Sequence, residues 1–363
     1  MFAGLVASLL ALLGAAAPPA ASAQADADWL LLDGPGSGIV HLRTSANGVV
    51  FAVDANHGFF RSDDAGDTWQ SVPGPAGGWP QLPDPTDPAT LYGVSADGLY
   101  KSTDAGASWA LLLPSPQPVR DLPWPHLAIS PADHNVLYLA GPLAPCCTPS
   151  GLVRSQDGGR TWSTATTFSP SSFCLDTVDV LVPHPTDPRR VYSDEGCYAG
   201  RSLGADLSVS NDGGSTWSVL FREGQQQEPR LLVGGAGADP NRLYLATSHF
   251  IQQGPARVYR SDDGGATWTM VLEATDRRSL RFGGLAYNPD QPDEVFAAMG
   301  MTTNPDDTGV RVSEDGGASW AILGRPDLGW INDLVRLPNG TLLAATNEGI
   351  WRYTPAPMPP DAG

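Results

Sequence analysis

Short apolar stretches alternate with turn-forming residues along most of the chain. Pairs of an aliphatic and an aromatic residue recur every 40–55 residues, as at Val50-Phe51, Leu137-Tyr138 and Val295-Phe296. Such residues favour strands, and Pro/Asp turns such as the PTDP at 185–188 separate one strand from the next. The pattern therefore predicts many short strands.

A turn motif follows each of these pairs. The pattern Ser-x-Asp-x-Gly-x-(Thr/Ser)-Trp occurs six times, and its tryptophans are Trp69, Trp109, Trp162, Trp217, Trp268 and Trp320. Ser and Asp side chains accept hydrogen bonds from nearby backbone N–H groups, Gly permits a positive φ, and Trp supplies a large apolar surface. We interpret the motif as a self-satisfied turn between two strands, not as six catalytic aspartates.

Each repeat reads as four strands, here called a to d, with the motif between c and d. Four-stranded units of 40–55 residues, repeated along a chain, predict a β-propeller. The unit "PTDP-x-x-VY … RS-x-DGG-x-TW" resembles the Asp-box (BNR) repeat of sialidases, two-propeller xyloglucanases, sortilin-type receptors and the photosystem II assembly factor propeller. The resemblance covers about residues 28–353. It implies a fold and no single function, because these proteins do unrelated things.

The number of blades follows from the two ends of the repeat region. Six Asp boxes give six c–d turns, and residues 331–353 supply strands a, b and c of one more unit. The segment from Asp28 to Leu32 resembles the strand that follows a box. We therefore expect an all-β, seven-bladed propeller over residues 24–354, with the N-terminal strand completing the last blade and closing the ring.

The segments outside the propeller have different compositions. Residues 1–23 contain an apolar run from Leu5 to Ala17 and a small-residue motif, Ala21-Ser22-Ala23, which together predict a signal peptide, although residues 1–6 carry no Lys or Arg. We expect export to the periplasm or medium of a bacterium. No later segment is apolar for 18 residues, so no membrane insertion is predicted. Residues 355–363 form a Pro-rich tail that we expect to be disordered.

The net charge narrows the choice of partners. The chain has 363 residues with 21 basic and 39 acidic side chains, a formal charge of −18. Nucleic acids and anionic lipids require a basic surface, so neither is expected as a partner. We expect a monomer that binds a protein or a glycan.

Four cysteines bear on the covalent structure: Cys146, Cys147, Cys174 and Cys197. In an exported chain they predict two disulfides, with zinc as the alternative. Adjacent cysteines pair poorly with each other, so Cys146 and Cys147 are each expected to reach one of the other two. We expect no cofactor. Asp-rich strings such as 304–307 leave Ca²⁺ as an option, although none has the EF-hand spacing.

The face opposite the Asp boxes is the candidate functional face. It carries the b–c and d–a loops, and the b–c connections are longer in blades 3 to 6 than in blades 1 and 2. Aligning the a strands gives a column near the central channel: His41, His126, Asp179, Gly284 and Asp333. Trp79, Trp124, Arg230, Arg281 and Trp330 are expected close by. A site that combines carboxylate, His, Arg and Trp side chains can bind a sugar or a peptide. The alternative is that these residues only line a solvated channel.

Tests for known catalytic patterns are mostly negative. The sialidase family begins its first blade with an Arg-Ile-Pro-like motif, whereas the similar Arg336-Leu337-Pro338 lies in the last blade, just before the a–b turn. The xyloglucanases hold their acid and base between two propellers, and this chain has one. Asp179 and Asp333 remain a candidate catalytic pair. The sequence therefore favours an exported binding or scaffold module, with a divergent sialidase-like or xyloglucanase-like glycoside hydrolase as the alternative.

Overall fold

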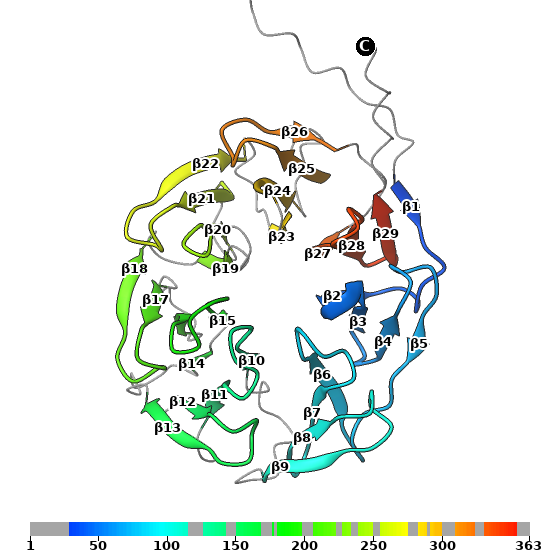
Figure 1. Ribbon diagram of the computed structural model, residues 1–363. Helices are drawn as coiled ribbons and strands as arrows, with labels where there is room; N and C mark the ends of the chain where they lie inside the picture. The colour runs from blue at the N-terminus through cyan, green and yellow to red at the C-terminus, as the bar shows by residue number, and fades with distance from the viewer. Residues whose placement is uncertain are drawn as a thin grey trace, which may run out of the picture.

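The computed structural model describes residues 29–114, 126–142, 150–167, 176–177, 180–197, 206–222, 227–233, 239–249, 255–274, 282–288, 291–299, 309–323 and 330–353. These residues form seven antiparallel sheets arranged as a ring about a central axis (Figure 1). Apart from one short 3₁₀ turn at Ala46–Gly48, the described elements are strands. The all-β, seven-bladed propeller predicted from the repeats is confirmed.

Six blades follow the chain order with strands a to d numbered from the axis outward. Blades 1 to 3 comprise β2 (Ile39–Thr44), β3 (Val50–Asp54), β4 (Phe59–Ser62) and β5 (Gln70–Ser71); β6 (Trp79–Pro83), β7 (Leu91–Ser95), β8 (Gly98–Ser102) and β9 (Ala110–Pro114); and β10 (His126–Ile129), β11 (Leu137–Pro142), β12 (Ser150–Ser155) and β13 (Ser163–Thr167). Blade 4 comprises β14 (Asp176–Thr177), β15 (Leu181–Pro183), β16 (Val191–Cys197), β17 (Asp206–Ser210) and β18 (Ser218–Phe221), with both β14 and β15 pairing with β16. Blades 5 and 6 comprise β19 (Gln227–Val233), β20 (Leu243–His249), β21 (Arg257–Ser261) and β22 (Thr269–Glu273); and β23 (Phe282–Asn288), β24 (Gln291–Met299), β25 (Gly309–Ser313) and β26 (Ala321–Ile322).

The last blade joins the two ends of the described chain. It contains β27 (Ile331–Arg336), β28 (Leu342–Thr346) and β29 (Ile350–Tyr353), and its outer strand is β1 (Trp29–Leu31). Trp29 pairs with Tyr353 across the two strands, and the two rings are 5.3 Å apart. The Trp29 indole also donates a 2.7 Å hydrogen bond to the carbonyl of Leu323 in blade 6. The first strand therefore closes the sheet of the last blade and contacts the neighbouring blade.

The Asp boxes have the same geometry in each repeat, and the box of blade 3 illustrates it. The Ser155 hydroxyl donates to Asp157 at 2.9 Å and accepts the N–H of Gly159 at 2.8 Å, where φ is +93°. Asp157 then accepts both the N–H (2.9 Å) and the hydroxyl (2.6 Å) of Thr161, and these bonds lower its pKa from 3.8 to about 2. The Ser and Asp side chains thus bond to donors within the turn, which supports the structural interpretation of the motif.

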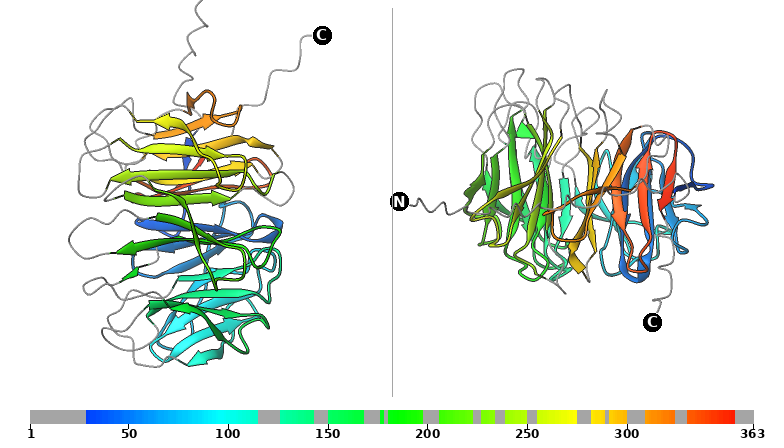
Figure 2. Two further views of the ribbon diagram at one scale, coloured as in Figure 1. Left: turned by 90° about the vertical axis from the view of Figure 1, so that its left-hand side faces the viewer. Right: turned by 90° about the horizontal axis from the view of Figure 1, so that it is seen from above.

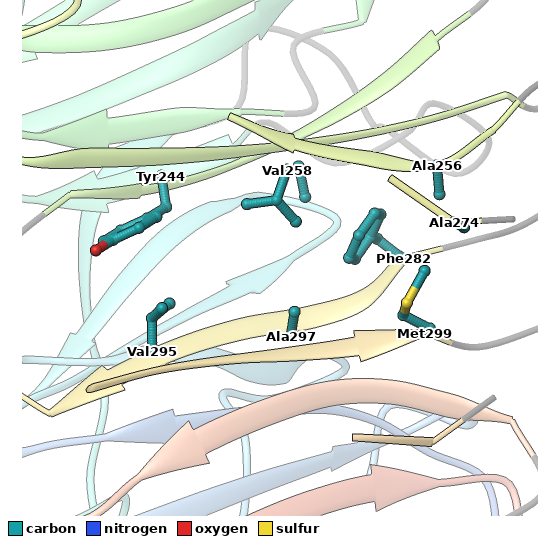
Figure 3. Close-up of a cluster of buried hydrophobic side chains, with 9 residues drawn as sticks. Tyr244, Ala256, Val258, Ala274, Phe282, Val295, Ala297 and Met299 are labelled. Carbon is teal, nitrogen blue, oxygen red and sulfur yellow. The ribbon is translucent and has the colours of Figure 1, made fainter. Parts of the chain in front are cut away.

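Apolar side chains fill the space between neighbouring blades. Between blades 5 and 6, Val258 and Tyr244 face Val295, Ala297 and Phe282, all of them at most 2% exposed (Figure 3). Box tryptophans strengthen these contacts, because the Trp320 indole of blade 6 donates to the carbonyl of Val271 in blade 5 at 2.9 Å. Each blade therefore buries its faces against its neighbours.

The strand directions divide the loops between two faces. Strands run roughly along the ring axis, so successive turns alternate between its two ends (Figure 2). The a–b turns and the Asp boxes share one end, here called the box face, and the b–c and d–a connections share the other, here called the loop face. No helix in the described part of the chain is long and apolar enough to cross a membrane.

Several predictions concern residues that the structure does not describe. These are the signal peptide over residues 1–23, the tail over 355–363, the string at 304–307, and Cys146, Cys147 and Cys174. Cys197 is the last residue of β16, and only its backbone is described. The export, tail, calcium and disulfide expectations stay predictions.

Candidate functional site

The inner strands bring six residues from six blades into one layer of the ring. Each of these residues pairs with the fourth residue of an apolar run in strand b. The pairs are His41 with Val53, Trp79 with Val94, His126 with Ala140, Arg230 with Ala246, Gly284 with Ala298, and Asp333 with Ala345. Trp79 and Arg230, expected beside the column, therefore lie in its register.

Part of the predicted site lies outside the described residues. Asp179 falls between β14 and β15, Trp124 precedes β10, and Arg281 precedes β23. Only the backbone of Arg230 is described. The glycine of the column has a packing explanation, because a Cβ at Gly284 would lie 2.7 Å from the backbone nitrogen of Leu334 in the next blade.

Asp333 connects the last blade to the first. Its Oδ2 accepts hydrogen bonds from the backbone N–H of Leu42 at 3.1 Å and from the Arg43 guanidinium at 3.0 Å. Its Oδ1 accepts the N–H of Leu334 at 2.9 Å, and the side chain is only 14% exposed. His41 lies nearby, with Nδ1 3.7 Å from Oδ2. These donors favour the ionised carboxylate, so Asp333 is suited to positioning and charge stabilisation more than to donating a proton.

A short loop on blade 1 holds a stacked aromatic pair on the loop face. The connection from Asp54 to Gly58 is organised by the Asp54 carboxylate, which accepts the N–H groups of Asn56 at 2.8 Å and Gly58 at 2.7 Å. His57 has a φ of +66° and donates its N–H to the Asp54 carbonyl at 3.1 Å. Its ring stacks on Trp79 of blade 2, with centroids 4.5 Å apart and planes inclined by 14°. His57 is exposed and Trp79 is partly buried.

Gly58 is required by this loop. A Cβ there would lie 2.6 Å from the Asp54 carboxylate and 2.9 Å from the ring of Phe60. The sequence signal, an Asp and a Gly flanking three residues, is too short to identify a site by itself.

A chain of backbone and amide contacts extends from this loop to Trp330. Ala55 donates to the Gly38 carbonyl at 2.9 Å, and Gly38 donates to the Asn347 carbonyl at 2.8 Å. Asn347 in turn donates to the Trp330 carbonyl at 3.4 Å, and the Trp330 side chain is 46% exposed. The loop faces of blades 7 and 1 are therefore joined through hydrogen bonds, and the His57–Trp79 stack links blade 1 to blade 2.

Asn332 adds a side-chain contact to the same junction. Its Nδ2 donates to the Ile39 carbonyl at 2.7 Å and to the Asn347 side-chain oxygen at 3.0 Å. On the blade 2 turn, the Tyr100 hydroxyl donates to Asp97 at 2.7 Å and lowers the pKa of that carboxyl. This part of the loop face thus presents exposed aromatic rings beside amides and a fixed negative charge.

The described residues give little support for a metal site or for a sialidase-like arginine site. No group of three or more His, Cys, Asp or Glu side chains in those ranges could hold a metal ion. Arg336, the residue of the sialidase-like string, is the last residue of β27 and donates to Glu294 at 3.2 Å, with its guanidinium 5.7 Å from the Phe296 ring centre. It is 9% exposed and supports the contact between blades 6 and 7.

Comparisons with known proteins agree with the fold. The family model described as BNR/Asp-box repeat matches residues 259–270, the box of blade 5. Together with the seven blades, this match identifies the chain as a β-propeller with Asp-box (BNR) repeats.

Its similar proteins include enzymes that act on xyloglucan. A probable oligoxyloglucan-reducing end-specific xyloglucanase of Neosartorya fischeri is 23% identical over 226 residues, covering 53% of this chain and 26% of the relative. The GH74 xyloglucanase of Xanthomonas campestris superposes with a TM-score of 0.68 and 19% identity, covering 89% of this chain and 53% of that structure. The chain thus spans about a quarter of the first relative and about half of the second.

The chain is also similar to a solved structure that it covers over nearly its whole length. The structure of YCF48 bound to D1 peptide superposes with a TM-score of 0.60 and 16% identity, covering 91% of this chain and 97% of that one. The two structures therefore match over nearly the whole of both chains. At these identities both structural comparisons establish the fold.

Proposed function

We propose that the protein is a glycoside hydrolase that acts on a xyloglucan-type polysaccharide at its loop face. The observation that carries this proposal is the sequence similarity to a xyloglucanase over more than half of the chain. It favours the hydrolase alternative over the scaffold that the sequence alone favoured. The exposed aromatic rings and amides on blades 7, 1 and 2 suit a sugar chain, because carbohydrate sites combine apolar ring faces with a few polar groups.

Hydrolysis of a glycosidic bond requires one carboxylic acid and one carboxylate. Asp333 supplies an ionised carboxylate stabilised by Arg43 and by the Leu42 N–H. The acid has to come from another carboxyl, and our candidate is Asp179, which is selected from the sequence and lies outside the described residues. In this assignment the Asp333 carboxylate takes a proton from the water that attacks the anomeric carbon, while Asp179 gives its proton to the glycosidic oxygen as that bond breaks.

A second candidate function is binding of a protein segment without catalysis. It is supported by the engagement of Asp333 with three backbone or guanidinium donors, and by the similarity to a single propeller whose structure contains a peptide. Under either function we propose export of the protein, because residues 1–23 carry the apolar run and small-residue motif of a signal peptide.

The test is release of new reducing ends from soluble xyloglucan by the full chain. We expect activity in the wild type, and a loss of at least a hundredfold in Asp179→Asn, since general acid catalysis contributes on the order of 10²–10⁴-fold. Asp133→Asn on the box face, where Asp133 only accepts the N–H and side-chain amide of Asn135, is the matched control and should keep full activity.

Four outcomes are decisive. Activity that is lost in Asp179→Asn and kept in Asp133→Asn supports the assignment. Equal activity in both variants overturns the role of Asp179 while leaving the hydrolase proposal intact. A wild type that binds xyloglucan without cleaving it refutes hydrolysis, and a wild type that binds no glycan leaves the peptide-binding candidate.

A further inference from the structure

We infer that the exposed face of the His57–Trp79 stack is a glycan subsite that receives one sugar ring on the loop face. The inference rests on the proposed function and adds the place at which the polysaccharide is held. It concerns a histidine that the sequence analysis did not select and a tryptophan whose partner was unknown.

The geometry of the pair matches the shape of its ligand. The two rings are 4.5 Å apart and nearly parallel, which leaves one flat imidazole face directed away from Trp79. His57 is exposed although it belongs to a tight loop, so its ring is available from solvent. A pyranose ring carries a flat face of C–H groups, and stacking such a face on an aromatic ring buries apolar area while the hydroxyls stay directed outward.

The loop keeps His57 in place before any ligand arrives. Asp54 accepts N–H groups from Asn56 and Gly58 through its carboxylate and from His57 through its carbonyl. A preorganised loop loses little conformational entropy on binding, so more of the contact energy contributes to affinity.

The backbone at His57 is in the left-handed region, with a φ of +66°. This conformation is uncommon for a residue with a Cβ, although His adopts it more often than most. The histidine therefore contributes its ring at some cost in backbone energy.

Exposed aromatic and polar groups continue from the pair along the loop face. The loop is hydrogen-bonded through Ala55 and Gly38 to Asn347. Asn347 is in turn hydrogen-bonded to Trp330, which is exposed. Asp97, an acceptor for sugar hydroxyls, lies on the turn that follows the β7 strand paired with Trp79. Two exposed aromatic rings and a carboxylate on three adjacent blades fit a linear polysaccharide better than a single small molecule.

The test compares matched variants in affinity electrophoresis through gels containing soluble xyloglucan, with the full chain. His57→Asn removes the ring and keeps a residue that tolerates positive φ, so the fold should be preserved. We expect its affinity for xyloglucan to fall about two- to tenfold, the range that an aromatic stacking contact contributes. Trp79→Phe keeps a smaller stack and should fall by less. Trp109→Phe, a box tryptophan of the same blade, should bind as the wild type does.

The results separate this inference from the proposed function. If the wild type binds xyloglucan and His57→Asn binds equally well, the subsite is wrong while the proposed function stands. If Trp109→Phe weakens binding as much as His57→Asn, the effect is general destabilisation and the subsite is refuted. If the wild type binds no xyloglucan, the proposed function fails and the subsite fails with it.

Discussion

Replacing Ser155 by alanine tests the structural role of the Asp boxes. Ser155 is 1% exposed, and its hydroxyl accepts the buried N–H of Gly159 at 2.8 Å while donating to Asp157 at 2.9 Å. Ser155→Ala removes that acceptor and leaves a buried donor without a partner. Such a loss costs about 1–3 kcal/mol, so the free energy of unfolding should fall by that amount.

The cost converts into a small but measurable shift of the melting temperature. For a chain of 363 residues, an unfolding entropy of about 2.1 cal/mol/K per residue gives roughly 0.8 kcal/mol/K in total. The melting temperature should therefore fall by roughly 1 to 4 °C in differential scanning calorimetry. The control is Ser163→Ala in β13, because the Ser163 hydroxyl is exposed and donates only a 3.4 Å bond to Arg154. Equal melting temperatures of the two variants would refute the reasoning, and a Ser155→Ala protein that melts normally but loses glycan binding would show that the box has a ligand role.

Three further predictions address closure, pH and the cysteines. Deleting residues 24–34 removes β1 and exposes the edge of β29, so the protein should aggregate or lose cooperative melting; an unchanged melting curve would contradict this. The pKa of Asp157 is lowered to about 2 by bonds from Thr161, so this carboxylate stabilises the fold above pH 3.8 and the stabilisation is lost as the pH falls towards 2. Asp157→Asn should flatten the dependence of melting temperature on pH over that interval, and an identical slope would count against the assignment. Peptide mapping without reduction should show Cys146 and Cys147 each bonded to a more distant cysteine, and a peptide containing both distant cysteines joined to each other would disprove it.

The sequence predicts the fold in detail because its repeat is both frequent and chemically specific. Ser, Asp, Gly and Trp at fixed spacing satisfy their own turn, so the box reports a c–d hairpin wherever it occurs. The last blade has no box, yet Trp29 and the apolar run at Leu342 follow the same pattern, and the structure pairs β1 with β29. Local patterns of this kind depend little on distant contacts.

The candidate site was predicted less completely, for a physical reason. The inner column follows from strand register, so His41, His126 and Asp333 could be aligned from the sequence. Contacts between blades cannot be read from a single repeat. The hydrogen bond from Arg43 to Asp333 joins residues that are 290 positions apart in the sequence. The stacking of His57 on Trp79 depends on the path of the loop that brings blade 1 to blade 2.

A crystal structure of the full chain with a xyloglucan-derived oligosaccharide tests the central claim most directly. The account predicts density for a sugar chain on the loop face of blades 7, 1 and 2, with one pyranose ring parallel to the His57 imidazole. A sugar bound on the box face, or crystals that stay free of sugar at saturating oligosaccharide, would contradict it.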